Sequence, residues 1–128
     1  MSQTVEGLYY SQTHEWVKVE GDEALVGITD YAQHALGSIV YVDMPEEDDE
    51  LAAGGDFGAV ESVKAASDLI APVSGMVLSV NGDLEDSPAL LNSDPFGTWI
   101  VRVKLSDSSE LELLMTASEY TAFCDSLK

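Results

Sequence analysis

One lysine stands apart in this chain of 128 residues. Lys64 is the only lysine or arginine between positions 20 and 101, whereas aspartate and glutamate recur throughout that span. An enzyme that acylates one amine needs a single target that it can reach, and amide formation at Nζ also removes the positive charge. Lys64 is therefore a candidate for covalent modification, although a lone exposed lysine is also an ordinary solvated charge.

Other reactive side chains form no recognisable catalytic or metal motif. His14 and His34 have no cysteine or carboxylate cluster at the spacing that metal sites use. The acidic run 46–50 lacks the alternating pattern of a calcium loop. Cys124 has no histidine partner in the sequence, and we expect it to be a buried apolar residue on the last helix. The sequence thus predicts neither a metal site nor a reactive thiol.

The charge balance restricts the class of partner. There are 24 acidic residues against five basic ones, which gives a formal net charge of −19. Such a chain is repelled by nucleic-acid phosphates and by anionic lipid surfaces, so we expect neither as a partner. A basic protein partner attracted by the field is compatible with this charge. So is the simpler interpretation that the charge keeps the protein soluble and monomeric.

Length and composition predict one globular domain over residues 1–128. No apolar run reaches the roughly 20 residues that span a bilayer. The N-terminal residues show neither a signal peptide nor a transit peptide. A single cysteine cannot form an internal disulfide and favours a reducing, intracellular compartment.

Alternating apolar and polar residues predict a mainly β chain. Residues 15–29 predict a hairpin that turns at Gly21-Asp22. Further strands are expected at 38–45, 76–82 and 98–105, and loops at 46–56 and 82–97.

Helices are expected in two places. A short one lies within 29–37, where Thr29 or Asp30 can cap the start and Gly37 can close the end. The C-terminal segment 106–128 predicts two more, at 106–115 and 116–128. The second opens with a capping box, Thr116 and Glu119. Four of its residues recur at helical spacing and are expected to pack on the core: Tyr120, Phe123, Cys124 and Leu127.

The segment around the lone lysine, GAVESVKAASDLIAPVSG at 58–75, is compatible with two structures. Its apolar residues recur at helical spacing, and Ala71-Pro72 would end such a helix. Lys64 would then make surface ion pairs worth about 0.2–0.5 kcal/mol each. Alternatively, two strands run out and back, and Lys64 lies at the exposed tip. Local propensity does not decide between them.

The stretch GAVESVKAASDLIAPVSGMVLSVN, together with His14-Glu15-Trp16, resembles the glycine cleavage system H-protein family, and the likeness extends from Leu8 to Phe123. Other lipoyl and biotinyl carriers lack the His-Glu-Trp stretch. The resemblance implies a mainly β barrel-sandwich hybrid of two small antiparallel sheets, with a short helix near 30–36 and C-terminal helices. It also favours the hairpin for 58–75.

A member of this family is a carrier and not an enzyme, so the resemblance implies no catalytic residue. It implies that a lipoate-attaching enzyme joins lipoate to Lys64 through an amide, and that this enzyme recognises Glu61. The lipoyl-lysine side chain would form a long, flexible arm. The arm would take an aminomethyl group from the pyridoxal-phosphate enzyme glycine decarboxylase. It would pass the group to the tetrahydrofolate-dependent aminomethyltransferase. The FAD enzyme dihydrolipoamide dehydrogenase would then reoxidise it.

The loaded arm would carry an aminomethyl thioaminal, which water would hydrolyse, so a dry cleft would protect it. Its amine is cationic, so a carboxylate in that cleft suits it. Matching family positions point to Glu15, with Thr13 and Asp68 beside it. From the residues alone, Glu15 is equally an exposed charge at a strand edge, and Asp68 a cap of the hairpin turn. Glu61 is equally an ordinary outward-facing strand residue.

Some alternatives stay open. Asp48 stands where the family has a glycine, and we expect it to tolerate a left-handed turn; the turn 96–99 is one residue shorter than usual. A second hypothesis is an H-like protein that relays lipoate to other proteins, and a third is an acidic interaction module without a cofactor. The compartment would be the mitochondrial matrix in a eukaryote, after loss of a transit segment, or the bacterial cytoplasm.

Overall fold

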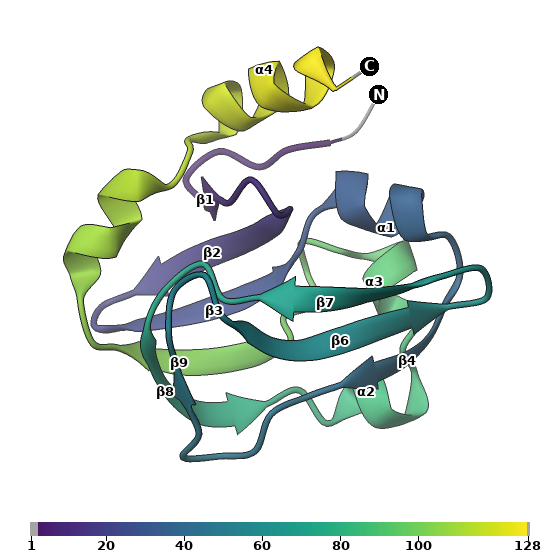
Figure 1. The fold of residues 1–128 in the computed structure, drawn as a ribbon, viewed down its shortest axis with the longest axis horizontal. Coiled ribbons are helices and arrows are strands. Elements are labelled where there is room, and N and C mark those ends of the chain that lie inside the picture. The colour runs from purple at the N-terminus through teal and green to yellow at the C-terminus, as the bar shows by residue number, and fades with distance from the viewer. Residues whose placement is uncertain (1–2, 128) are drawn as a thin grey trace.

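The computed structural model describes residues 3–127, which form two antiparallel sheets with short helices at their ends (Figure 1). The first sheet has six strands, in the order β1 (Tyr9–Tyr10), β2 (Glu15–Glu20), β3 (Glu23–Ile28), β9 (Val101–Leu105), β8 (Gly75–Val80) and β5 (Glu50–Leu51). The second has three, in the order β4 (Ile39–Asp43), β6 (Asp56–Ser62) and β7 (Ala66–Ile70). The predicted mainly β class and both predicted sheets are confirmed.

The core lies between the two sheets and consists mostly of valine, leucine and isoleucine. In the six-stranded sheet, strand alternation turns Val17, Val26 and Val103 inward, where they are fully buried. In the three-stranded sheet, Val42 and Val60 are cross-strand partners and face the same core. A second buried cluster, which includes Tyr10, Trp16 and Tyr120, covers part of the outer face of the six-stranded sheet.

Helix α1 (Asp30–Leu36) is the predicted short helix. The Thr29 hydroxyl accepts a hydrogen bond from the Ala32 amide, and Gly37 closes the helix with a φ of 78°. The predicted loop 82–97, in contrast, contains two single-turn helices, α2 (Asp83–Asp86) and α3 (Leu90–Ser93). Leu84 and Leu91 are fully buried, so these turns form because they place one leucine each in the core.

The C-terminal prediction is partly wrong. A 3₁₀ helix, η1 (Ser108–Leu113), replaces the first predicted helix, and α4 (Ala117–Ser126) follows it with the predicted capping box. Tyr120 and Cys124 are buried as expected, but Leu127 is 48% exposed because it lies just past the last helical residue. Strand β9 also begins three residues later than predicted. None of the helices among the described residues is long and apolar enough to cross a membrane.

Residues 58–75 form a hairpin and not a helix. Strands β6 and β7 pair from Asp56–Ile70 to Glu61–Ala66, and their turn projects at the end of the molecule where α1 lies (Figure 1). The loop at 46–56 contains the short strand β5, which pairs with β8. Within this loop Asp48 adopts the left-handed conformation expected of it, with a φ of 72°.

Candidate functional site

The turn of the β6–β7 hairpin presents Lys64 to solvent. Ser62 organises this turn, because its amide donates to the Ala65 carbonyl at 2.7 Å and its hydroxyl accepts from the Ala65 amide at 3.1 Å. Asp68, the predicted alternative cap, lies within β7 and makes no such contact. The Lys64 side chain is exposed and forms no ion pair among residues 3–127.

Residues just after α1 contact this turn and stabilise it. The Val63 amide donates to the Ser38 carbonyl at 3.1 Å, and the stem of Lys64 runs past Gly37. A Cβ at Gly37 would lie 3.5 Å from Lys64 Cε, so the lysine packs on bare backbone. Asn92 of α3 fixes that backbone by donating to the Gly37 carbonyl at 2.8 Å. The turn that carries Lys64 is thus held by two helices as well as by its own hairpin.

Glu15 is buried, with 2% of its surface exposed, and connects the two sheets. It begins β2 in the six-stranded sheet. Its Oε1 accepts hydrogen bonds from the hydroxyls of Ser11, at 2.8 Å, and Thr13. Its Oε2 accepts a bond from the amide of Ile70, at the end of β7, at 3.3 Å. The interpretation of Glu15 as an exposed strand-edge charge is therefore wrong.

Burial sets the protonation of this carboxyl. Removal from water raises the pKa of Glu15 to about 7, and the hydrogen bonds from Thr13, Ser11 and Ile70 oppose that rise because they favour the charged form. At neutral pH the group is therefore divided between its acid and its carboxylate. A cation brought next to it would shift it towards the carboxylate, since an opposite charge lowers a carboxyl pKa.

A tight loop aims Glu15 inward. Ser11 and Glu15 close the loop through their backbones at 3.0 Å, and His14 between them has a left-handed backbone with a φ of 73°. The His14 ring stacks on Tyr31 at 4.4 Å, and its Nδ1 lies 2.7 Å from the Tyr120 hydroxyl. Burial lowers the pKa of His14, which keeps the ring neutral at pH 7. These contacts hold the strained residue in place.

Strand β7 runs from the turn that carries Lys64 to the buried carboxyl of Glu15. It is an edge strand, so its outer side is unpaired, and the Ile70 amide on that side is the one that Glu15 accepts. From Ala66 to Ile70 a strand rises about 13 Å. Lys64 lies just before this strand and Glu15 at its far end. A flexible arm attached to Lys64 and folded back along β7 would therefore end near Glu15.

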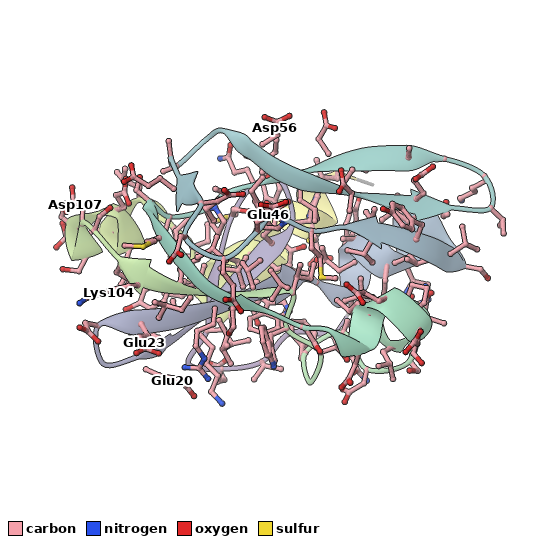
Figure 2. The ribbon with its side chains drawn as sticks, turned by 90° about the horizontal axis from the view of Figure 1, so that it is seen from below. Glu20, Glu23, Glu46, Asp56, Lys104 and Asp107 are labelled. Carbon is pink, nitrogen blue, oxygen red and sulfur yellow. The ribbon has the colours of Figure 1, made fainter. Side chains whose placement is uncertain are left out.

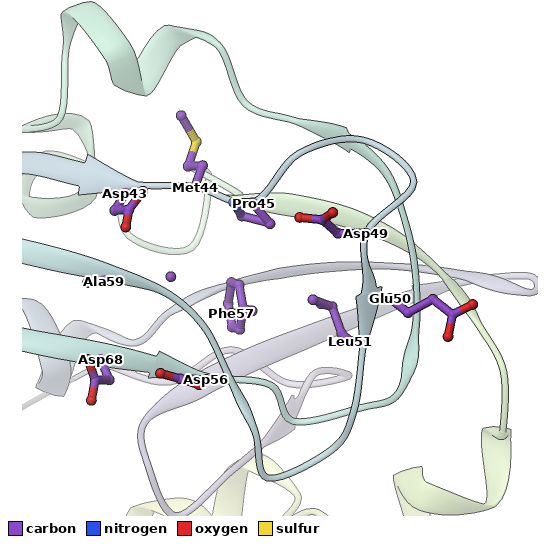
Figure 3. A pocket seen from close by; sticks show the side chains of 11 residues that line it. Asp43, Met44, Pro45, Asp49, Glu50, Leu51, Asp56, Phe57, Ala59 and Asp68 are labelled. Atoms are coloured by element: carbon purple, nitrogen blue, oxygen red, sulfur yellow. The ribbon is translucent and has the colours of Figure 1, made fainter.

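The structure brings together only some of the predicted residues. Thr13 contacts Glu15 directly. Asp68 is exposed on the outer face of the hairpin, in a row with Ala59 and Asp43. It lines a hollow of about 510 Å³, where Figure 3 shows Ala59 between the two aspartates. No contact joins Asp68 to Glu15 among the described residues. Glu61 is also exposed, opposite Tyr41 on β4.

Most of the other basic side chains lie elsewhere, on the six-stranded sheet. Arg102 donates to Glu20 and Glu23 at 3.1 and 3.0 Å, which neutralises part of that sheet. Figure 2 shows Lys104 on the same side as these two glutamates and Asp56 on the other side of the molecule. Residues 3–127 contain no group of three or more histidine, cysteine or acidic side chains placed to hold a metal ion.

Two partners of Glu15 were missed at the sequence level. Ser11 is buried and makes the hydroxyl bond described above, yet a serine before a strand carries no signal of such a role. The Ile70 amide is a backbone group, so no residue type could have indicated it. Ser11 becomes a partner because the loop 11–15 folds back on itself, and Ile70 because the end of β7 approaches that loop.

Comparison with known proteins identifies the family of this chain. The family model of the glycine cleavage H-protein matches residues 8–127. A glycine cleavage system H protein of Alkaliphilus oremlandii is 61% identical over 122 residues, which cover 95% of this chain and 96% of that protein. One from Thermoanaerobacter pseudethanolicus is 59% identical over 123 residues, covering 96% and 98%.

A solved structure shows the same fold. The crystal structure of a glycine cleavage system H protein from Mycobacterium marinum superposes with a TM-score of 0.85 at 40% identity, covering 93% of this chain and 97% of that one. The mainly β barrel-sandwich architecture is thereby confirmed. This chain therefore belongs to the glycine cleavage H-protein family, whose members are lipoyl carriers of the glycine cleavage system and not enzymes themselves.

Proposed function

We propose that Lys64 Nζ is the atom that carries lipoate in this protein. The observation that carries the proposal is the presentation of this amine: it lies at the tip of a hairpin, exposed, and without a carboxylate partner among the described residues. A supported turn gives the modifying enzyme a fixed target, since Ser62 and the end of α1 hold its backbone. Glu61, three residues before the lysine, would contribute to recognition by the lipoate-attaching enzyme.

Lipoate on this amine would supply a dithiolane that takes an aminomethyl group at glycine decarboxylase, yields it at the tetrahydrofolate-dependent aminomethyltransferase, and is reoxidised by the FAD enzyme dihydrolipoamide dehydrogenase. The protein's own residues would present the arm and shelter its end. Glu15 would hold the cationic amine by charge, in a loop that Ser11 and Thr13 stabilise. Asp68, which lies on β7 between Lys64 and Ile70, would add negative charge along the path of the arm.

Binding of the cationic end of the arm would be coupled to loss of a proton from the Glu15 carboxyl. The pKa of Glu15 is raised to about 7 by burial, so part of the population carries a proton on this carboxyl at neutral pH. Arrival of a cationic amine would release that proton, because the ion pair favours the carboxylate. An uncharged arm would gain no such interaction and would be free to move away from Glu15. The buried carboxyl would thus distinguish a loaded arm from an empty one.

Mass spectrometry of protein from its native source tests the assignment, with lipoyl mass expected on the peptide that contains residues 58–75.

Lys64→Arg is expected to abolish glycine–bicarbonate exchange with the decarboxylase and to leave the fold unchanged. Exchange at the wild-type rate in Lys64→Arg, or lipoyl mass on another lysine, would contradict the proposal. Lys104→Arg, on β9, is the matched control and should behave as wild type.

The carrier role, and not a lipoate relay, is the one that the comparisons favour, since the relatives named above are H proteins of the cleavage system. We further propose that residues 1–128 act as one monomeric carrier unit with no nucleic-acid or membrane partner. The named relatives come from bacteria, which supports the bacterial cytoplasm as its location.

A further inference from the structure

Three large apolar side chains are exposed around the attachment point. Val63, immediately before Lys64, is 74% exposed, and Tyr41 and Val40 of β4 are 54% and 53% exposed. Single exposed apolar residues are common on protein surfaces and need no explanation. Here three of them lie close to the one amine that is proposed to be modified. We refer to Val40, Tyr41 and Val63 as the apolar patch.

A β-bulge causes this exposure. The pairing of β4 with β6 shifts by one residue between Ile39 and Tyr41, so Val40 has no partner on β6. In a regular strand Val40 and Tyr41 would point to opposite faces, whereas the bulge leaves both outside, between the buried Ile39 and Val42. The core gains nothing from this arrangement, because two apolar side chains are turned away from it.

The register places the patch beside the hairpin turn. Tyr41 is the cross-strand partner of Glu61, and Ile39 is the partner of Ser62, so the start of β4 lies next to the turn. Paired strands are about 4.8 Å apart, and the Val63 amide is bonded to the Ser38 carbonyl at 3.1 Å. In addition, β4 is an edge strand of the three-stranded sheet, so no further strand covers its outer side.

We infer that the apolar patch and Glu61 form the docking surface for the enzyme that acylates Lys64, an inference that rests on the function proposed above. An unmodified lysine is short, so the active site of that enzyme must approach Nζ closely and cover the residues around the turn. Partners that act on the finished arm meet its far end instead. The matching partner surface has an apolar hollow for Tyr41 and Val63 and a lysine or arginine that faces Glu61.

The experiment measures lipoylation of the unmodified protein by a purified lipoate-attaching enzyme with lipoate and ATP, from the initial gain in intact mass. We expect Tyr41→Ser and Val63→Ser each to lower kcat/KM by about tenfold, as loss of an interface anchor does. Tyr41→Phe should keep most of the rate, since the ring makes the contact. Leu113→Ser is the control: Leu113 is 86% exposed but lies on η1.

Thermal unfolding of each variant, within a few degrees of wild type, excludes a folding defect as the cause. Wild-type rates in both serine variants would overturn the inference and leave the function of Lys64 intact. Absence of lipoylation in the wild type itself would overturn the proposed function. A normal lipoylation rate with impaired glycine–bicarbonate exchange would assign the patch to the decarboxylase and would also overturn the inference.

Discussion

Replacing the buried carboxyl by an amide, Glu15→Gln, should remove a large part of the pH dependence of stability. Folding raises the pKa of Glu15 from an ordinary 4.5 to about 7, so the folded state retains a proton that the unfolded chain releases. The unfolded state therefore binds fewer protons between these values, and the free energy of unfolding falls as pH rises through this window. Below pH 4.5 both states are protonated and the penalty vanishes.

The magnitude follows from the size of the shift. Each pKa unit corresponds to about 1.4 kcal/mol, so the shift from 4.5 to about 7 amounts to about 3.4 kcal/mol in total. Roughly 2.5 kcal/mol of this falls between pH 5 and pH 8, by the linkage relation. That is a substantial share of the 5–15 kcal/mol that stabilises a typical domain. Glutamine resembles the protonated acid in shape and does not titrate, so the variant avoids this loss.

Urea denaturation of the unlipoylated protein at pH 5 and pH 8 measures the effect. The difference in unfolding free energy, variant minus wild type, should increase by about 2.5 kcal/mol between the two pH values. Glu61→Gln changes an exposed carboxylate and is the control, whose difference should stay nearly constant. If Glu15→Gln ran parallel to wild type within about 0.5 kcal/mol, Glu15 would not be the group whose burial matters, and the proton coupling proposed above would be refuted.

Two further substitutions test the hydrogen bonds of Glu15 and the packing of its neighbour Trp16. Ser11→Ala removes a donor to the carboxylate and should raise the pKa of Glu15 further, measured by carbon NMR titration of the side chain; Ser118→Ala, on the exposed side of α4, should leave it unchanged. Gly27→Ala places a Cβ 2.6 Å from the buried Trp16 ring and should cost about 1–3 kcal/mol in urea denaturation. Gly82→Ala, with open space around it, should cost far less, and equal costs would refute the steric argument.

The elements with the clearest patterns could be predicted from sequence. In the hairpin of β2 and β3, Val17 and Val19 alternate with Lys18 and Glu20 before a glycine turn, and α1 has both a capping residue and a closing glycine. Residues 58–75 could not be assigned by pattern, because their apolar residues fit a helix as well as a strand. Only the resemblance favoured the hairpin. The pairing of β7 along β6 then overrides the local preference, since long-range hydrogen bonds replace those of a helix turn.

Within the site, the sequence predicted Lys64, Glu15 and the contact of Thr13 with Glu15, but not the other partners of Glu15. Residue type cannot show that Glu15 is buried, because its burial depends on the approach of Ile70 from the other sheet. Asp68 was expected beside Glu15, and the register places it instead in the row of Ala59 and Asp43. The bulge that exposes Val40 was equally invisible, since an isolated Ile-Val-Tyr-Val sequence resembles any buried strand.

The hydroxyl of Tyr120 has a consequence for the reach of the arm. It lies 2.7 Å from His14, in the loop that aims Glu15, and 2.7 Å from Thr29, which caps the start of α1. The other end of α1 supports Lys64. One oxygen atom on the last helix thus serves as a common anchor for both places between which the arm would travel. The distance between the Lys64 turn and the Glu15 loop is therefore fixed by the fold. An arm of constant length can reach Glu15 without a change in the backbone.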